Sequence, residues 1–167
     1  FGVGENLITS KSDAVLGGVY KMVAKETAQG IKPLIKVSEQ IVKITNPGYK
    51  KVYRLYDKDT KKAIADYIAL HDEVINSEEL YLFDEIQPWK NKTVTNYEVR
   101  ELQVPIFKQG ELIYEIPTQA QSKAYCQQEL DSLWDELKRL IKPHNYYVDL
   151  SPKLYQLKQD LLKEHTK

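Results

Sequence analysis

Alternation of apolar and polar residues marks much of the first two-thirds of the chain. The segments 51–56 and 63–70 carry such runs on either side of the polar loop 57–62. This pattern predicts two antiparallel strands, although the second run also suits a helix. Upstream, the β-rich run 18–24 and the short apolar run 33–37 predict two further strands. The first part of the chain is therefore expected to form a sheet.

Two later apolar stretches, 80–83 and 102–107, also predict strands, the second near a sheet edge because it contains a proline. A tight turn at Gln109–Gly110 would pair the end of that stretch with residues 112–113, which predicts a hairpin. The tripeptide Asn46-Pro47-Gly48 predicts another turn. Proline presets φ at one turn position, and glycine accepts the positive φ needed at the next.

The hydrophobic period changes after Thr118. From there to Pro143 apolar residues recur at helical spacing, which predicts a long helix with one buried stripe. The stripe comprises Cys126, Leu130, Leu133, Trp134, Leu137, Leu140 and Ile141. Ser151 and Pro152 predict the capped start of a last helix. Strands first and helices last indicate the α+β class, with antiparallel strands and hairpins followed by C-terminal helices.

Composition places the chain among ordinary globular proteins. Its 167 residues suffice for one domain, and 42% are hydrophobic and 29% charged. No apolar run approaches the roughly 20 residues of a membrane span, so we expect no membrane partner. The single Cys126 cannot form an internal disulfide, which favours a reducing, cytoplasmic setting.

Charge is balanced overall, with 24 basic and 24 acidic residues, so it predicts no nucleic-acid partner. Its distribution is uneven. Residues 31–62 hold nine basic and three acidic residues, whereas 63–86 hold seven acidic residues and no Lys or Arg. Two solvated faces of opposite charge explain this asymmetry more simply than a surface for a polyanion. The charge distribution is therefore weak evidence for function.

The residues form no self-contained catalytic set. His71, His144 and His165 are too scattered for a local metal cluster, and no Cys or His pair has zinc spacing. Nucleophile-elbow, phosphate-loop and kinase motifs are absent from the sequence. We therefore predict no catalytic and no metal-binding residue in this chain.

The sequence begins with a glycine loop, Phe1-Gly2-Val3-Gly4-Glu5-Asn6, without an initiator methionine. A Gly-x-Gly turn lets backbone N–H groups approach an anion closely. Taken alone, such a turn is more often merely tight than phosphate-binding, because the feeding strand of a glycine fingerprint is missing here. We expect the chain to be the tail of a longer protein.

Read together, blocks along the whole chain resemble the C-terminal part of nicotinate phosphoribosyltransferases. Their order is the same from the first residue nearly to the last, which is more specific than any single block. The blocks are 1–4, 6–10, 16–21, 36–38, 43–48, 52–54, 100–102, 104–107, 133–135 and 143–151.

The resemblance implies a parent enzyme built on the irregular α/β barrel of type II phosphoribosyltransferases. Residues 1–30 would be the barrel's end and returning strand, and 31–167 a C-terminal α+β domain. The parent would make nicotinate mononucleotide from nicotinate and phosphoribosyl pyrophosphate in NAD salvage, with ATP hydrolysis and Mg²⁺. The remaining barrel and a second subunit of a homodimer are the implied partners. The fragment alone is expected to be inactive and to hold no cofactor.

By the same resemblance, Gly2, Gly4 and Asn6 would bind the phosphate end of the substrate. Glu5 stands where many relatives have Thr, and a carboxylate there would repel phosphate unless it turns away or Mg²⁺ intervenes. The histidine that ATP phosphorylates would lie upstream. Two other hypotheses remain: an autonomous anion-binding or oligomerisation module, and a related phosphoribosyltransferase for another pyridine base.

Overall fold

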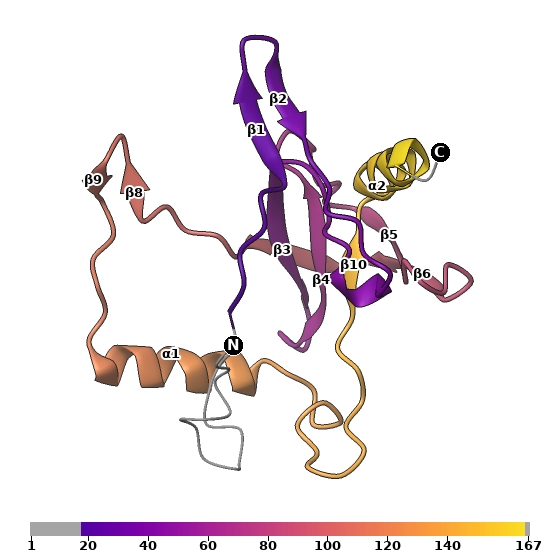
Figure 1. Ribbon diagram of the computed structural model, residues 1–167. Coiled ribbons are helices and arrows are strands. Elements are labelled where there is room, and N and C mark those ends of the chain that lie inside the picture. The colour runs from indigo at the N-terminus through magenta and orange to yellow at the C-terminus, as the bar shows by residue number, and fades with distance from the viewer. Residues whose placement is uncertain (1–17, 166–167) are drawn as a thin grey trace, which may run out of the picture.

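The structure is a computed structural model, and it describes residues 18–165. Its centre is a four-stranded sheet in the order β10-β4-β3-β7 (Figure 1). The strands are β3 (Lys50–Asp57), β4 (Ala63–Leu70), β7 (Tyr97–Glu101) and β10 (Val148–Leu150). β3 pairs antiparallel with β4 and β7, whereas β10 runs parallel to β4. This arrangement confirms the predicted α+β class and the predicted pair of strands around the loop 57–62.

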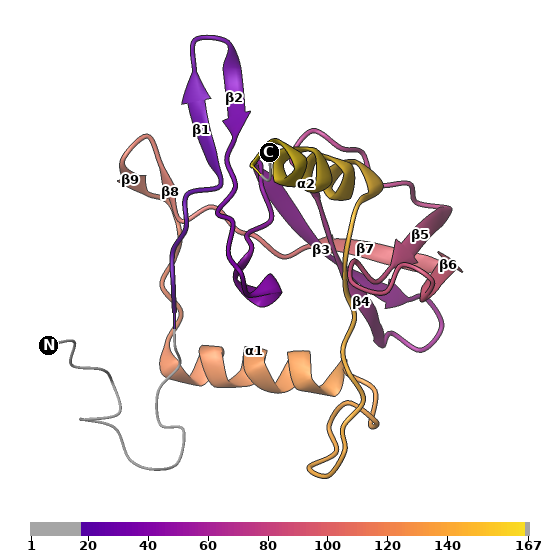
Figure 2. The ribbon, with the colours of Figure 1, turned by 45° about the vertical axis from the view of Figure 1, so that its right-hand side comes forward.

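Three antiparallel hairpins surround the sheet. They consist of β1 (Ala24–Thr27) with β2 (Gly30–Pro33), β5 (Glu79–Phe83) with β6 (Asn91–Thr95), and β8 (Phe107–Lys108) with β9 (Glu111–Leu112). The β8–β9 register, Phe107 opposite Leu112, confirms the predicted hairpin. Figures 1 and 2 show β1–β2 and β8–β9 projecting away from the sheet, while β5–β6 lies against it.

The helices differ in how they are held. α1 (Gln119–Asp131) begins with a capping box, in which Thr118 and Gln121 exchange side-chain and backbone hydrogen bonds. α2 (Pro152–His165) begins as predicted, with the Ser151 hydroxyl accepting from the Leu154 N–H at 3.0 Å. A single 3₁₀ turn, η2 (Ile41–Lys43), lies between β2 and β3. α2 packs against β4, and its Leu154 is fully buried.

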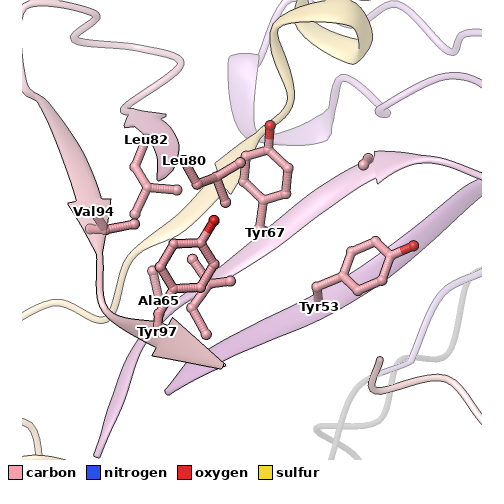
Figure 3. Packing of buried hydrophobic residues seen from close by; sticks show 9 residues of the cluster. Tyr53, Ala65, Tyr67, Leu80, Leu82, Val94 and Tyr97 are labelled. Carbon is pink, nitrogen blue, oxygen red and sulfur yellow. The ribbon is translucent and has the colours of Figure 1, made fainter. Parts of the chain in front are cut away.

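The core lies between one face of the sheet and the β5–β6 hairpin. Odd-numbered residues of β3 and β4 point to this face, where they meet inward-pointing side chains of β5 and β6 (Figure 3). The cluster comprises Tyr53, Leu55, Ala65, Tyr67, Ala69, Leu80, Leu82, Val94 and Tyr97. Tyrosines fit here because their rings fill the core while a hydroxyl can still bond, as Tyr97 does to the Asn76 carbonyl.

Several strand predictions were wrong. Residues 18–23 and 34–37 lie outside regular structure, and the hairpin β1–β2 forms between them. Val19 and Tyr20 are more than four-fifths exposed, since no neighbouring strand accepts them. The segment 102–106 is likewise irregular. The chain pairs just before it as β7, a five-residue strand that was not predicted.

The predicted length of the long helix was also wrong. α1 ends at Asp131 because carbonyls that a continuing helix needs are used otherwise: Ser132 C=O accepts from the Ala63 N–H at 2.8 Å. The Lys62 ammonium binds the Asp131 and Leu133 carbonyls. The stripe is not core, since α1 buries no residue, and Cys126 is exposed.

Gly48 occupies the predicted turn with φ +86°, and a Cβ there would lie 2.8 Å from Leu70 Cδ2. Gly48→Ala is expected to lower the free energy of unfolding by about 1–2 kcal/mol through left-handed strain, plus the cost of moving Leu70. Gly110→Ala is the matched control, because Gly110 has φ +84° but open space around it. Urea unfolding of both variants separates the two costs, and equal losses would contradict a steric contribution at Gly48.

Candidate functional site

The predicted phosphate-binding residues Gly2, Gly4 and Asn6 lie outside the described residues, as does Glu5. Their placement stays a prediction. The described part of the chain offers three other features: a row of charges on the sheet, an exposed arm, and a cavity containing a buried carboxylate.

The charge row crosses three strands on the sheet face opposite the core. Arg54 of β3 lies directly across from Asp66 of β4 and from Arg100 of β7. Its guanidinium binds both Asp66 carboxylate oxygens, at 2.7 and 3.0 Å. Two arginines opposite each other would repel, so the row requires a further anion.

Glu129, near the end of α1, supplies that anion. Its Oε2 accepts from Arg54 at 2.8 Å and from Arg100 at 2.6 Å. On the other side, the Tyr146 hydroxyl donates to Asp66 at 2.9 Å. The hydrogen bond to Asp66 raises the pKa of Arg54. The row thereby attaches the end of α1 and residue 146 to the sheet.

The basic segment 31–62 does not form an open cationic face. The Lys50 ammonium donates to the carbonyls of the 46–48 turn, and Lys62 to carbonyls at the end of α1. Lys51 and Lys61 form ion pairs with Glu101 and Glu98 of β7. Most of these cations therefore serve contacts within the fold, which gives little support to a polyanion surface.

The exposed arm is the segment 102–131, which includes β8, β9 and α1. It leaves the sheet after β7 and returns to it at Glu129 and Ser132. Between those anchors its large apolar side chains face solvent, among them Val104, Phe107, Leu112, Ile116 and Tyr125. Figure 2 shows α1 separated from the sheet along most of its length. Such continuous apolar exposure is typical of a surface that another protein segment covers.

The cavity, of about 1390 Å³, lies between the β5–β6 hairpin and the loop 133–147. Leu82, Lys92 and Val94 line it from the hairpin. Trp134, His144 and the tyrosines 146 and 147 line it from the loop. Most of the other lining residues are polar or charged, so the cavity offers a ligand both charged groups and aromatic rings.

Asp149 of β10 contributes a carboxylate to this cavity. It lies beside Tyr67 of the parallel strand β4, so it points to the core face of the sheet. Only 6% of the residue's surface is exposed, and no described group donates a hydrogen bond to its carboxylate. Burial, followed by the charge of nearby Asp84, raises the pKa of Asp149 to about 6. The fold thus places the ionisable side chain of Asp149 on the core face of the sheet, where apolar side chains are usual.

The histidines do not meet. His71 packs on the Tyr49 ring with centroids 4.7 Å apart, and the His144 N–H donates to the Glu136 carbonyl. Across residues 18–165, no three His, Cys, Asp or Glu side chains are placed to hold a metal ion. Among the helices in that range, none is long and apolar enough to cross a membrane.

Neither the charge row nor the buried carboxylate was predicted from the sequence. The row joins residues 12, 46 and 75 positions from Arg54 along the chain, at 66, 100 and 129. A signal existed for Asp149, since it stands between Val148 and Leu150 just before the helix start at Ser151. That three-residue strand was too short to be recognised by its alternation.

Comparison with known proteins gives a consistent result. The sequence matches the family model described as nicotinate phosphoribosyltransferase C-terminal domain over residues 49–158. It is 39% identical over 165 residues to nicotinate phosphoribosyltransferase of Bacillus subtilis (strain 168), covering 98% of this chain and 34% of that protein. The protein of the same name from Homo sapiens is 33% identical over 165 residues, which are 96% of this chain and 29% of the human one.

A solved structure agrees with these relatives. The crystal structure of human nicotinic acid phosphoribosyltransferase matches with a TM-score of 0.70 at 28% identity, over 89% of this chain and 27% of that chain. The chain thus spans about a third or less of the length of the relatives it matches. These matches confirm the resemblance found in the ordered sequence blocks.

Proposed function

Since this chain belongs to the nicotinate phosphoribosyltransferase family, we propose that it serves as the C-terminal domain of an enzyme that makes nicotinate mononucleotide from nicotinate and phosphoribosyl pyrophosphate. The observation that carries the proposal is the collinear match to the family's C-terminal domain over residues 49–158. The relatives that share the match are nicotinate phosphoribosyltransferases from bacteria to animals. Their name supports a place in pyridine nucleotide synthesis and NAD salvage.

Within that enzyme, the domain braces the catalytic part. The arm 102–131 supports this role, because both its ends are fixed to the sheet while its apolar side chains between them are exposed. The occupant we propose for this surface is the upstream part of the enzyme, since the relatives are about three times longer than this chain. The charge row around Arg54 then transmits the position of the arm to the sheet.

ATP and Mg²⁺ belong to the proposed reaction of the whole enzyme. The described residues supply no group of three metal-ligating side chains, so we assign both to the upstream part. Residues 1–30 are proposed to form the end of the catalytic barrel, where the backbone amides of Gly2 and Gly4, with Asn6, bind the substrate's phosphate end. Oriented amides stabilise phosphate charge without reorganising during the reaction.

We also propose a homodimer in the cytoplasm. The exposed apolar side chains at Leu140 and Ile141 support a further protein contact beyond the arm. The exposed thiol of Cys126 supports a reducing compartment, where it stays unpaired.

Assay of the 167-residue chain with nicotinate, phosphoribosyl pyrophosphate, ATP and Mg²⁺ is expected to yield no nicotinate mononucleotide. Turnover by this chain alone would contradict the assigned role. The longer enzyme containing it should be active, and Phe107→Ser in the arm should lower its activity and its melting temperature. Val74→Ser is the matched control, because Val74 is also an exposed apolar residue but lies outside the arm. Equal effects of the two variants would argue against the arm as the docking surface.

A further inference from the structure

We propose that the cavity beneath the loop 133–147 is a binding site for an organic cation, an alkylammonium or guanidinium group held by the carboxylates of Asp149 and Asp84. The inference goes beyond the proposed transferase function. It rests on the geometry of residues far along the chain from the glycine loop.

Asp149 is the first element of the argument. Asp149 is only 6% exposed as a residue, and a carboxylate in such a place normally accepts hydrogen bonds or pairs with a cation, since uncompensated burial of a charge is costly. No described residue donates a hydrogen bond to the Asp149 carboxylate, whereas the backbone of β10 pairs with β4. Its side chain lines the cavity, so a ligand in that cavity can reach it.

Asp84 is the second element. It follows β5 and lines the same cavity. Its Oδ1 already accepts from the backbone N–H groups of Ile86 and Gln87, both at 2.8 Å. These bonds fix the carboxylate and leave its other oxygen without a described donor. Asp84 therefore adds negative charge beside Asp149 at a fixed position.

Other charged groups of the cavity do not neutralise this pair. The Asp57 carboxylate accepts hydrogen bonds from the backbone N–H and the hydroxyl of Thr60, and Glu136 forms an ion pair with Arg139. Lys90, Lys92 and His144 also line the cavity. Within residues 18–165, none of these three makes a hydrogen bond or ion pair with Asp149. The carboxylates of Asp149 and Asp84 therefore face the same cavity, and neither makes an ion pair among the described residues.

The chemistry of this donor set selects the class of ligand. Two carboxylates are too few oxygen ligands for Ca²⁺ or Mg²⁺, which take about six or more, often with several waters. An ammonium or guanidinium group has three to five N–H donors, which two carboxylates can accept. The Trp134 and Tyr147 rings suit the alkyl portion of such a ligand and attract its charge.

Titration with butylammonium chloride and butylguanidinium chloride tests the site at pH 7.5 in an amine-free buffer. Binding is followed by NMR at the Trp134 indole N–H and the Asp149 carboxyl carbon. Saturable shifts are expected in the wild type, with at least about tenfold weaker binding in Asp149→Asn and Asp84→Asn. Asp72→Asn, an exposed site with the same charge change, should bind as the wild type does. Tetramethylammonium, which has no N–H, should bind no better to the wild type than to Asp149→Asn.

Repeating the titration with the longer enzyme distinguishes the source of the cation. Binding there that depends on Asp149 identifies a free amine as the ligand. Loss of probe binding in the longer enzyme, with binding kept in this chain, identifies a Lys or Arg side chain of the upstream part as the occupant. Both results support the site, and neither depends on turnover.

Three results would overturn the proposal. The first is equal binding by the wild type and Asp149→Asn, and the second is no binding by this chain. The third is a rise of more than about one unit in the Asp149 pKa in Lys92→Met, which would show that Lys92 is already its partner.

Discussion

Arg54→Met is expected to lower the free energy of unfolding by about 3–4 kcal/mol, because it leaves two carboxylates on the sheet without their shared cation. Asp66 is only 9% exposed and would keep just the Tyr146 hydroxyl as a donor. Glu129 would keep Arg100, whose side chain is 39% exposed. Methionine preserves much of the aliphatic volume, so the loss reports charge and hydrogen bonding more than packing. Urea unfolding at pH 7 measures it.

Arg139→Met is the matched control. Its ion pair with Glu136 spans 3.4 Å between two well-exposed side chains, so its loss is expected to cost less than about 1 kcal/mol. A second variant separates charge from position. Adding Asp66→Leu to Arg54→Met removes one of the unpaired carboxylates, and it should recover part of the lost stability. Losses of similar size at Arg54 and Arg139 would show that the charge row does not hold the fold together.

Asp149→Asn is expected to stabilise the protein relative to the wild type as pH rises from 4 to 7.5. The pKa of Asp149 rises from its ordinary 3.8 to about 6 on folding, so the folded state holds a proton that the unfolded state has released. Stability contributed by this group is therefore complete below pH 3.8 and is lost as pH rises to about 6. The side chain lines a cavity, so solvent screening reduces the effect below the full value of that shift, and we expect a loss of about 1–2 kcal/mol above pH 7.

The measurement is the difference in free energy of unfolding between Asp149→Asn and wild type at each pH. Subtracting the two free energies cancels the contribution of the other titrating groups. The difference should grow by about 1–2 kcal/mol across this range. Asp72→Asn, which makes the same change of charge at an exposed position, is the control. Amine-free buffer is required, because a bound ammonium ion would lower the pKa of Asp149 and hide the effect. A difference that is constant with pH would show that Asp149 is ionised without cost in the folded protein.

Elements held by local pattern were predicted well. The alternation in 51–56 and 63–70 predicted β3 and β4, and the turn at 46–48 follows from the φ preferences of proline and glycine. The start of α2 at Ser151 was also correct, because capping is a bond between residues three positions apart. Family membership was visible as well, since it rests on ordered blocks that need no knowledge of contacts.

Elements that depend on distant partners were predicted poorly. β7 and β10 are short, and each is a strand because β3 or β4 offers it an open edge. α1 is shorter than its periodicity because carbonyls at its end bind Lys62 and Ala63, which are about 70 positions away. Its apolar stripe faces solvent, since a periodic pattern shows that a helix has an apolar face but not what covers that face.

For the candidate sites the same distinction holds. The sequence by itself determined the fold class, the main strand pair, the family and the candidate phosphate loop at Gly2 and Gly4. Only the tertiary structure decided that Arg54, Asp66, Arg100 and Glu129 form one charge row, and that no described residue donates to the carboxylate of the largely buried Asp149. Strand register and burial set the environment of a charged side chain. Both depend on segments that are far apart in the sequence, so the local sequence pattern does not predict them.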